Sequence, residues 1–451
     1  MEQPFQGAVA GGNLVVCRLM MEDEMSERQV QSIGPVQRRA LFSSFIGWMF
    51  DGFETSTLIL VGGVAAMSLL GNPTPEEIRM AVGIAIGATL LGWAAGGTIG
   101  SIMADRIGRK KMLMISIVGY SALTALTAFS PTWTILIALR FLTGMFLGSE
   151  WSTGTALVAE TWPDRSRAKA LGIMQSGYGF GFFLAAGLWL WIQPHWGPEA
   201  WRLMFVIGVL PAFLLLYIRR KVPESKLWLE AVREQASGET ISAKHQSGLT
   251  RLFGDPEGLK RAVATLVMAA VTVSVFYGIS ALIGPYIGAL AAKEGLTASS
   301  WASMSALVYN GGSIVGYISA GFIADRIGRK PYMLIMFSGA IIAGVIQAFV
   351  PETLTWSLVS VFILGMFTLG VFSWMPIYLP ELFKTKIRST ASGIVFNLAR
   401  LVSFPLPIMT AFLFSTLGGY HMTVLSMVLL YVVAIFALWF LPETRGKPLP
   451  N

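Results

Sequence analysis

Long apolar stretches recur along almost the whole chain, separated by short polar segments. A helix that spans a bilayer needs about 20 mostly apolar residues. The pattern predicts twelve such helices, at 40–67, 80–103, 112–129, 132–158, 169–192, 200–218, 262–289, 300–323, 332–350, 354–379, 389–414 and 422–441. Near Pro131 two apolar runs almost fuse, and hydropathy alone does not divide them there.

A longer polar stretch divides these helices into two groups of six. It is expected to contain a short helix around 225–235. The predicted fold is an all-α membrane protein of twelve transmembrane helices in two six-helix halves. Its predicted segments are a tail at 1–38, one half at 39–218, a linker at 219–260, the second half at 261–441 and a tail at 442–451.

The polar segments contain an internal repeat. The string DRIGRK occurs at Asp105–Lys110 and again at Asp325–Lys330, each time between two apolar runs. Glu160 and Glu381 recur at nearly the same offset, and so do Pro-Glu-Ser after the sixth run and Pro-Glu-Thr after the twelfth. A parallel duplication of a membrane-embedded half is a layout of secondary transporters.

Composition supports a membrane protein and weakens other classes. Of 451 residues, 54% are hydrophobic and 13% charged, whereas soluble domains average about 25% charged. The net charge of +8 is better explained by basic loops than by nucleic-acid binding. Cys17 is the single cysteine, so the chain cannot form a disulfide framework. Residues 1–38 lack the pattern of a signal peptide.

The distribution of basic residues predicts an orientation. If the N-terminus is inside, outer loops contain only Arg79, Arg202 and Lys293 of the 33 Lys and Arg residues. Arg140 and Arg400 lie within predicted helices, and the other 28 fall on the inner side. This bias predicts a multi-pass protein of the cell (inner) membrane with both termini cytoplasmic.

These features resemble the major facilitator superfamily over about residues 39–449. The segment 148–181, GSEWSTGTALVAETWPDRSRAKALGIMQSGYGFG, is similar to sialate and monocarboxylate proton symporters. Asp51-Gly52-Phe53-Glu54 resembles the acidic first-helix motif of aromatic-acid symporters. The family's loop motif has Gly four residues before its Asp. Gly321 fits, whereas the first copy has Ser101, whose small side chain should still allow close helix approach.

Ionisable side chains at membrane depth are costly and therefore mark functional candidates. Asp51 and Glu54 lie three residues apart on one helix face. Two carboxylates in a low-dielectric cavity do not both ionise cheaply, so we expect one to carry a proton. Glu150 is a third candidate for proton coupling or gating. The alternatives are a hydrogen bond to a neighbouring helix for the first pair and a structural ion pair for Glu150.

Arg400 is the leading candidate to bind a substrate anion, with Asn397 on the same face. A guanidinium keeps its charge and binds carboxylates through two parallel hydrogen bonds. The alternative is an internal salt bridge to a carboxylate of the first or fourth helix. Arg140 does not align with Glu150 and needs a partner elsewhere, unless it reaches the membrane surface. Further candidates for the substrate pocket are Arg140, Gln175, Tyr178, Tyr277, Tyr309, Asn310 and Trp374.

The repeated loop strings are expected to form ion-pair latches that close one end of the protein. Plain positive-inside topology is the alternative, but it requires no acidic residue. The expected latch residues are Asp105, Arg106, Arg109, Glu160, Arg167, Asp325, Arg326, Arg329, Glu381 and Arg388. Gly144 and Gly148 are spaced for close helix packing.

No catalytic signal is present. The three histidines, His195, His245 and His421, are all predicted in loops or at helix ends. The chain has no phosphate-binding GxxxxGK[ST] loop, which argues against ATP as the energy source. We expect no enzyme activity, metal or cofactor. The predicted function is proton-coupled uptake of a small organic carboxylate by alternating access, with lipid, proton and acid as partners. The alternatives are a drug/proton antiporter and a non-transporting membrane sensor.

Overall fold

The computed structural model describes residues 33–238, 254–349, 353–402, 413–414 and 416–450. These residues form α-helices and short 3₁₀ turns, with no β-strand among them. The longer helices are α2 (Pro35–Leu70), α3 (Pro75–Ile107), α4 (Arg109–Ala128), α5 (Trp133–Thr161), α6 (Arg167–Trp196), α11 (Pro256–Lys293), α12 (Ala298–Ile327) and α13 (Arg329–Phe349). The linker contains the short helix α9 (Lys226–Gly238). The shorter ones are η1 (Gly197–Glu199), α7 (Ala200–Ile207), α8 (Pro211–Lys221), α14 (Leu354–Thr368), η3 (Gly370–Ser373), α15 (Trp374–Leu382), α16 (Arg388–Val402), α18 (Tyr420–Leu429) and α19 (Tyr431–Leu438).

Eleven helical segments of the described chain are long and apolar enough to cross a membrane. They correspond to eleven of the twelve predicted helices, including the pair divided near Pro131. The remaining predicted helix, 389–414, is occupied by α16 up to Val402, and 403–412 lie outside the described residues. The predicted tail up to residue 32, which includes Cys17, and linker residues 239–253 also lie outside the described residues. The linker helix expected around 225–235 is confirmed as α9.

Three predicted helices are interrupted. The sixth is divided into α7 and α8, and Pro211 is the first residue of the second piece. The tenth is divided into α14 and α15 by the 3₁₀ turn η3, and the twelfth into α18 and α19. Other helices begin earlier than their apolar runs. α3 begins at Pro75 because Thr74 and Glu77 form a capping box that satisfies its first N–H groups.

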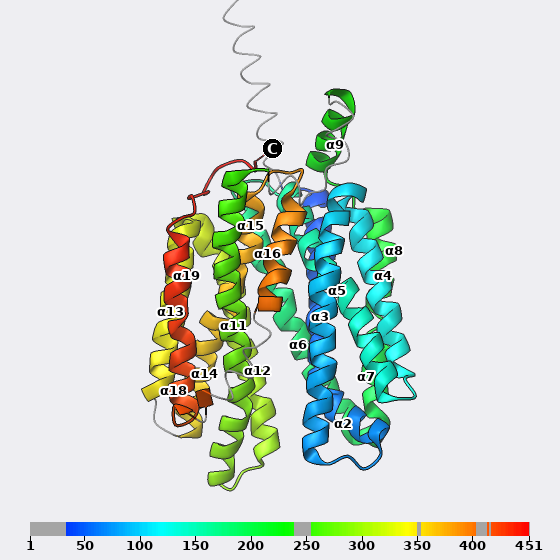
Figure 1. Cartoon of the computed structure of the whole chain (residues 1–451), viewed down its shortest axis with the longest axis vertical. Coiled ribbons are helices and arrows are strands. Elements are labelled where there is room, and N and C mark those ends of the chain that lie inside the picture. Colours follow the sequence, from blue (N-terminus) through cyan, green and yellow to red (C-terminus); the bar gives the residue numbers. More distant parts are fainter. Residues whose placement is uncertain (1–32, 239–253, 350–352, 403–412, 415, 451) are drawn as a thin grey trace, which may run out of the picture.

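The helices form two groups that stand side by side, α2–α8 and α11–α19 (Figure 1). The groups meet where α6 packs on α12 and α3 packs on α16. Small residues allow both contacts. A Cβ on Gly172 would lie 2.8 Å from the carbonyl oxygen of Tyr317, and a Cβ on Gly393 would collide with Ser101. Ser101 is accommodated because its hydroxyl donates to the carbonyl of Gly97 at 2.5 Å.

Glycines also bring α3 and α5 into backbone contact. A Cβ on Gly144 would collide with the backbone of Thr89, and one on Gly148 with the backbone of Trp93. The close packing predicted for this glycine pair is therefore confirmed, with α3 as the partner helix.

Replacing Gly144 with Ala is expected to lower the free energy of unfolding by about 1–3 kcal/mol, because the methyl group meets backbone that cannot rotate away. Gly83→Ala is the matched control. A Cβ at Gly83 meets nothing within 4 Å, so the better helix propensity of Ala should stabilise by up to about 1 kcal/mol. Thermal unfolding in detergent measures both variants. Equal unfolding temperatures would contradict the packing argument.

Candidate functional site

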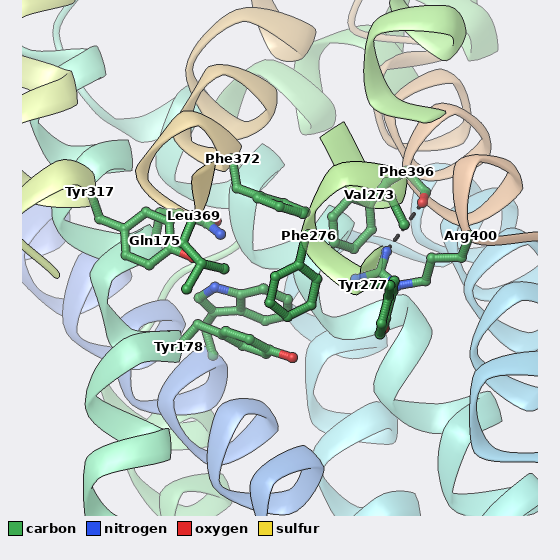
Figure 2. A pocket seen from close by; sticks show the side chains of 11 residues that line it. Gln175, Tyr178, Val273, Phe276, Tyr277, Tyr317, Leu369, Phe372, Phe396 and Arg400 are labelled. Atoms are coloured by element: carbon green, nitrogen blue, oxygen red, sulfur yellow. Dashed lines mark hydrogen bonds between the residues drawn. The ribbon is translucent and has the colours of Figure 1, made fainter. Parts of the chain in front are cut away.

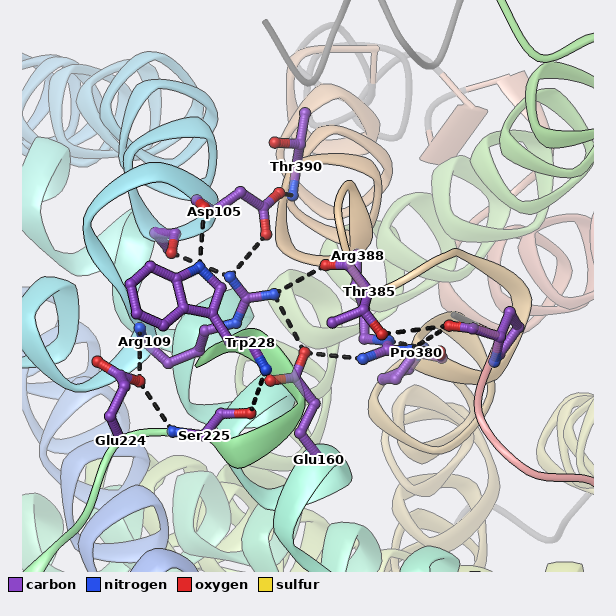
Figure 3. A network of polar contacts seen from close by, with 12 residues as sticks. Asp105, Arg109, Glu160, Glu224, Ser225, Trp228, Pro380, Thr385, Arg388 and Thr390 are labelled. Atoms are coloured by element: carbon purple, nitrogen blue, oxygen red, sulfur yellow. Dashed lines mark hydrogen bonds and ion pairs between the residues drawn. The ribbon is translucent and has the colours of Figure 1, made fainter. Parts of the chain in front are cut away.

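One end of the bundle holds a buried ion-pair network, and we call it the charged end. Arg109 at the start of α4 lies 2.9 Å from Asp105 and donates to Glu160 of α5 at 3.1 Å. Arg388 of α16 donates to the same Glu160 oxygen at 2.8 Å. The other Asp105 oxygen accepts the backbone N–H of Thr390 at 2.7 Å. This network joins the two helix groups (Figure 3).

The second copy of the motif repeats this geometry. Arg329 donates to both oxygens of Glu381, at 2.7 and 2.9 Å, and lies 3.1 Å from Asp325. Arg167 of α6 lies 3.4 Å from Glu381, and Asp325 accepts the N–H of Lys169 at 3.3 Å. Each half thus contributes an aspartate to the first turn of a helix in the other half.

Eight of the ten residues expected in the latch belong to these two networks. Arg106 and Arg326 do not, because both are exposed and form no ion pair within the described chain. The charge of these two positions is therefore a loop feature rather than part of the network.

Two glutamates that the sequence marked only as repeats cap the helices of these networks. Glu224 accepts the N–H groups of Arg109 and Lys110 at 2.9 and 3.1 Å. Glu443 accepts that of Arg329 at 3.0 Å and three further N–H groups. Partial burial opposes ionisation of Glu443, but these hydrogen bonds lower its pKa below the usual value. Its stabilising contribution is therefore present above the unfolded-state pKa and is lost as the pH falls through the folded-state pKa.

Two further contacts at the charged end were not foreseen. The carbonyl of Pro450, after α19, accepts from Arg388 at 2.8 Å and from the N–H of Thr385 at 3.1 Å. The indole of Trp228 on α9 donates to the carbonyl of Asp105 at 2.9 Å. Both the linker helix and the C-terminal segment therefore touch the network.

Glu160→Gln is expected to loosen the charged end, because Arg109 and Arg388 would lose the anion that they share. The readout is thiol labelling of Ser101→Cys, a fully buried site between α3 and α16, in a Cys17→Ser background. Labelling should accelerate at least about tenfold. Glu199→Gln is the control, since its ion pair with Arg202 is largely exposed and should contribute little. Unchanged labelling in Glu160→Gln would contradict the latch.

Arg140 of α5 is fully buried, and its ion-pair partner lies on another helix. It forms an ion pair with Glu54 of α2 and donates to the hydroxyls of Thr127 and Thr143 at 2.7 and 3.0 Å. Its guanidinium also lies over the ring of Phe205. In this structure the Glu54 carboxylate is therefore held by Arg140.

Asp51 lies within electrostatic range of Glu150 of α5, and also of Glu54 and Arg400. The side chains of Asp51 and Glu150 are buried, and none of their four carboxylate oxygens has a hydrogen-bond partner of standard geometry within the described residues. The Glu150 carboxylate lies against Gly47, one turn before Asp51 on α2, where a side chain would leave no room. Two unpaired carboxylates in apolar surroundings strongly disfavour double ionisation.

A cavity of about 380 Å³ lies between the two helix groups (Figure 2). Seven of its lining residues are aromatic, and Arg400 is the one charged residue among the described residues that line it. The lining consists of Trp48, Gln175, Tyr178, Val273, Phe276, Tyr277, Tyr317, Leu369, Phe372, Phe396 and Arg400. Of the predicted pocket residues, Gln175, Tyr178, Tyr277 and Arg400 are therefore placed here.

Arg400 is held by aromatic rings and backbone rather than by an acid. Its guanidinium lies 3.8 Å from the ring centre of Phe396 and 4.5 Å from that of Trp93. One nitrogen donates to the Phe396 carbonyl at 3.1 Å, while Nε has no hydrogen-bond partner among the described residues. No carboxylate within the described chain lies at ion-pair distance. The alternative salt bridge with the first or fourth helix is thus not formed in this structure.

Four other predicted pocket residues do not line this cavity, and each forms a hydrogen bond elsewhere. Their partners are the Gly393 carbonyl for Asn397, Thr368 for Tyr309, the Ala306 carbonyl for Asn310 and Thr272 for Trp374. Trp48, Phe276, Tyr317, Phe372 and Phe396 were missed. Their sequence signal is weak, since aromatic residues in a membrane helix equally fit lipid contact or packing.

A second cavity of about 420 Å³ adjoins the first. Tyr277 lines both cavities, and Glu54, Arg140 and Trp93 line the second. Arg140 thus faces a cavity, as predicted for a pocket residue, but its guanidinium is already bound to Glu54.

Two packed groups of membrane-length helices, with buried charges and a cavity between them, define a polytopic membrane transporter. The chain belongs to the major facilitator superfamily, whose family model matches residues 40–407 and 276–451. It is therefore a multi-pass secondary transporter and not an enzyme.

Curated relatives and a solved structure support this assignment. The chain is 27% identical over 420 residues to a "Probable 4-methylmuconolactone transporter" of Cupriavidus pinatubonensis, covering 92% of this chain and 93% of the relative. It is 27% identical over 413 residues to "Sialic acid transporter NanX" of Escherichia coli, covering 88% and 91%. The proton:xylose symporter XylE of E. coli has the same fold, with a TM-score of 0.75 and 20% identity over 92% of this chain and 98% of that chain.

Proposed function

We propose that this protein takes up a small organic carboxylate together with protons by alternating access. The two halves, residues 39–218 and 261–441, would move relative to one another and open the central cavity to each side of the membrane in turn. The observation that carries the proposal is Arg400, a guanidinium that lines a central cavity and has no acidic partner at ion-pair distance among the described residues. A cation held in a largely apolar cavity is costly unless an anion neutralises it. A substrate carboxylate supplies that anion through two parallel hydrogen bonds.

The proton sites in this proposal are Asp51 and Glu150. Both lie buried in the same helix group, and their carboxylate oxygens have no hydrogen-bond partner of standard geometry in the part of the chain that the structure describes. One of them therefore readily accepts a proton from the outer side. The neutralised site then tolerates closure around the bound acid. Release of the proton on the inner side restores the negative charge near Arg400 and favours release of the substrate anion.

The proposed orientation has both termini and the charged end in the cytoplasm of a cell whose inner membrane holds the protein. It is supported by the excess of Lys and Arg on that side of the chain. The substrate class is supported by relatives named as transporters of 4-methylmuconolactone, sialic acid and cis,cis-muconate.

A drug/proton antiporter would bind cations in the same cavity. Arg400 disfavours that function, because its positive charge lies where the cation would bind. A membrane sensor would bind the acid without moving it.

Purified protein in liposomes tests the proposal. A panel of labelled organic acids is offered outside, and an internal pH dye follows protons. Acid uptake with simultaneous internal acidification, driven by an inward proton gradient, is the expected result. Efflux of a lipophilic cation in exchange for protons would favour the antiporter. Binding without flux would favour the sensor, and either result would overturn the proposal.

A further inference from the structure

The walls of the central cavity are mainly flat rings. Trp48 and Tyr178 stack with ring centres 4.8 Å apart, and Phe276 meets Phe372 edge to face at 5.7 Å. Figure 2 shows the ring of Phe276 between Gln175 on one side and Arg400 on the other. Such walls favour a thin, unsaturated ligand that stacks on them. They disfavour a polyhydroxylated acid, many of whose hydroxyl groups would lose water without finding partners.

The orientation of the Gln175 amide is fixed by its neighbour. The indole Nε1 of Trp151 lies 3.1 Å from the Gln175 side chain, and an indole N–H can only donate. Gln175 must therefore present its oxygen to Trp151. The amide nitrogen has no hydrogen-bond partner among the described residues, and the side chain lines the cavity. The two N–H groups of the Gln175 amide are thus free to donate hydrogen bonds on the side of the cavity opposite Arg400.

Trp151 positions both polar sides of the cavity. Its ring stacks on Phe396 with centres 3.8 Å apart and planes 14° apart. Phe396 in turn holds Arg400 through its ring and its carbonyl. One tryptophan therefore orients the Gln175 donor directly and the Arg400 cation through Phe396.

We infer that the central cavity selects a flat, unsaturated monocarboxylate that carries a hydrogen-bond acceptor at the end opposite its carboxylate. Arg400 binds the carboxylate, the aromatic rings sandwich the body, and Gln175 donates to the distal acceptor. This inference rests on the proposed function and specifies its substrate. Because the cavity holds one cationic side chain among its described lining residues, a second carboxylate would remain without a cation.

Three ligand comparisons on the wild-type protein test the inference without any variant. Benzoate against cyclohexanecarboxylate tests flatness. 4-Acetylbenzoate against 4-isopropenylbenzoate replaces a distal C=O by C=CH₂ at nearly constant shape and tests the acceptor. Benzoate against gluconate tests exclusion of polyhydroxylated acids. Competition against the uptake of a labelled substrate should favour the first member of each pair, by about tenfold for the acceptor pair.

Two variants locate the acceptor site. Gln175→Leu should reduce the preference for 4-acetylbenzoate to about twofold or less while the preference for benzoate over cyclohexanecarboxylate persists. Trp151→Phe retains a ring to stack on Phe396 but removes the N–H, so the Gln175 amide becomes free to turn. That variant should weaken the acceptor preference with little effect on flatness.

Equal competition by cyclohexanecarboxylate and benzoate would overturn the inference, as would an acceptor preference that survives in Gln175→Leu. Neither result affects proton-coupled carboxylate uptake, which is tested by flux and internal pH alone. Conversely, absence of uptake for every acid would overturn the proposed function before specificity is measured.

Discussion

Arg400→Gln is expected to reduce carboxylate uptake by about 100-fold or more. The glutamine keeps much of the side chain's length but removes the charge that would neutralise a buried substrate anion, and charged hydrogen bonds are roughly twice as strong as neutral ones. Losing both parallel hydrogen bonds accounts for an effect of this size. Initial uptake rates in liposomes, with protein content matched, provide the measurement.

Two companion variants sharpen this experiment. Arg400→Lys keeps the charge but loses the planar fork, so it should retain intermediate activity and a raised KM. Arg106→Gln removes an arginine that is exposed and outside the ion-pair networks, and it should transport like wild type. Full activity of Arg400→Gln would remove this residue from the substrate site. A loss in Arg106→Gln would point to a non-specific effect of charge removal.

Asp51→Asn is expected to abolish uptake driven by a proton gradient while substrate exchange continues. An amide resembles the protonated carboxyl in size and charge but cannot release a proton. The loaded carrier therefore still cycles in both directions, whereas net uptake, which requires deprotonation, stops. Exchange is measured by preloading liposomes with unlabelled acid, and net uptake is measured in empty liposomes with a proton gradient.

Glu150→Gln separates the two carboxylates. If Asp51 is the coupling site and Glu150 sets its protonation, the glutamine variant should retain coupled uptake with a shifted pH dependence, since one negative neighbour of Asp51 is gone. Glu54→Gln should behave differently, because it leaves Arg140 buried without its anion and should mainly reduce stability. Full proton-driven uptake by Asp51→Asn would remove Asp51 from the coupling scheme.

Much of the fold could be predicted from the sequence because lipid imposes length and polarity on each helix separately. Apolar runs located eleven membrane-length segments, and the repeated DRIGRK string located both ion-pair networks. The interruptions at Pro211 and at η3 were not predicted, since an apolar run looks the same whether the helix within it is straight or broken.

The candidate site was predicted less completely, because it depends on tertiary pairing. Asp51, Glu54, Arg140 and Glu150 could each be singled out as costly at membrane depth. Which acid pairs with Arg140 depends on how α2 meets α5, and spacing along one helix does not determine that. The aromatic cavity wall was largely missed for a related reason. An aromatic residue in a membrane helix gives the same apolar signal in the sequence whether its ring faces lipid or a substrate.

Two of the crossings between the helix groups, α6 with α12 and α3 with α16, are made by backbone and very small side chains, Gly172 with Gly321 and Gly393 with Ser101. Contacts of this kind have no flexible atoms that could stretch to follow a separation. Any opening at the charged end that separates α3 from α16 must therefore break the Gly393–Ser101 contact outright, since neither side can stretch to keep it. Natural variation at the four positions should accordingly be limited by volume, with Gly, Ala and Ser exchanged more freely than any residue with a branched side chain.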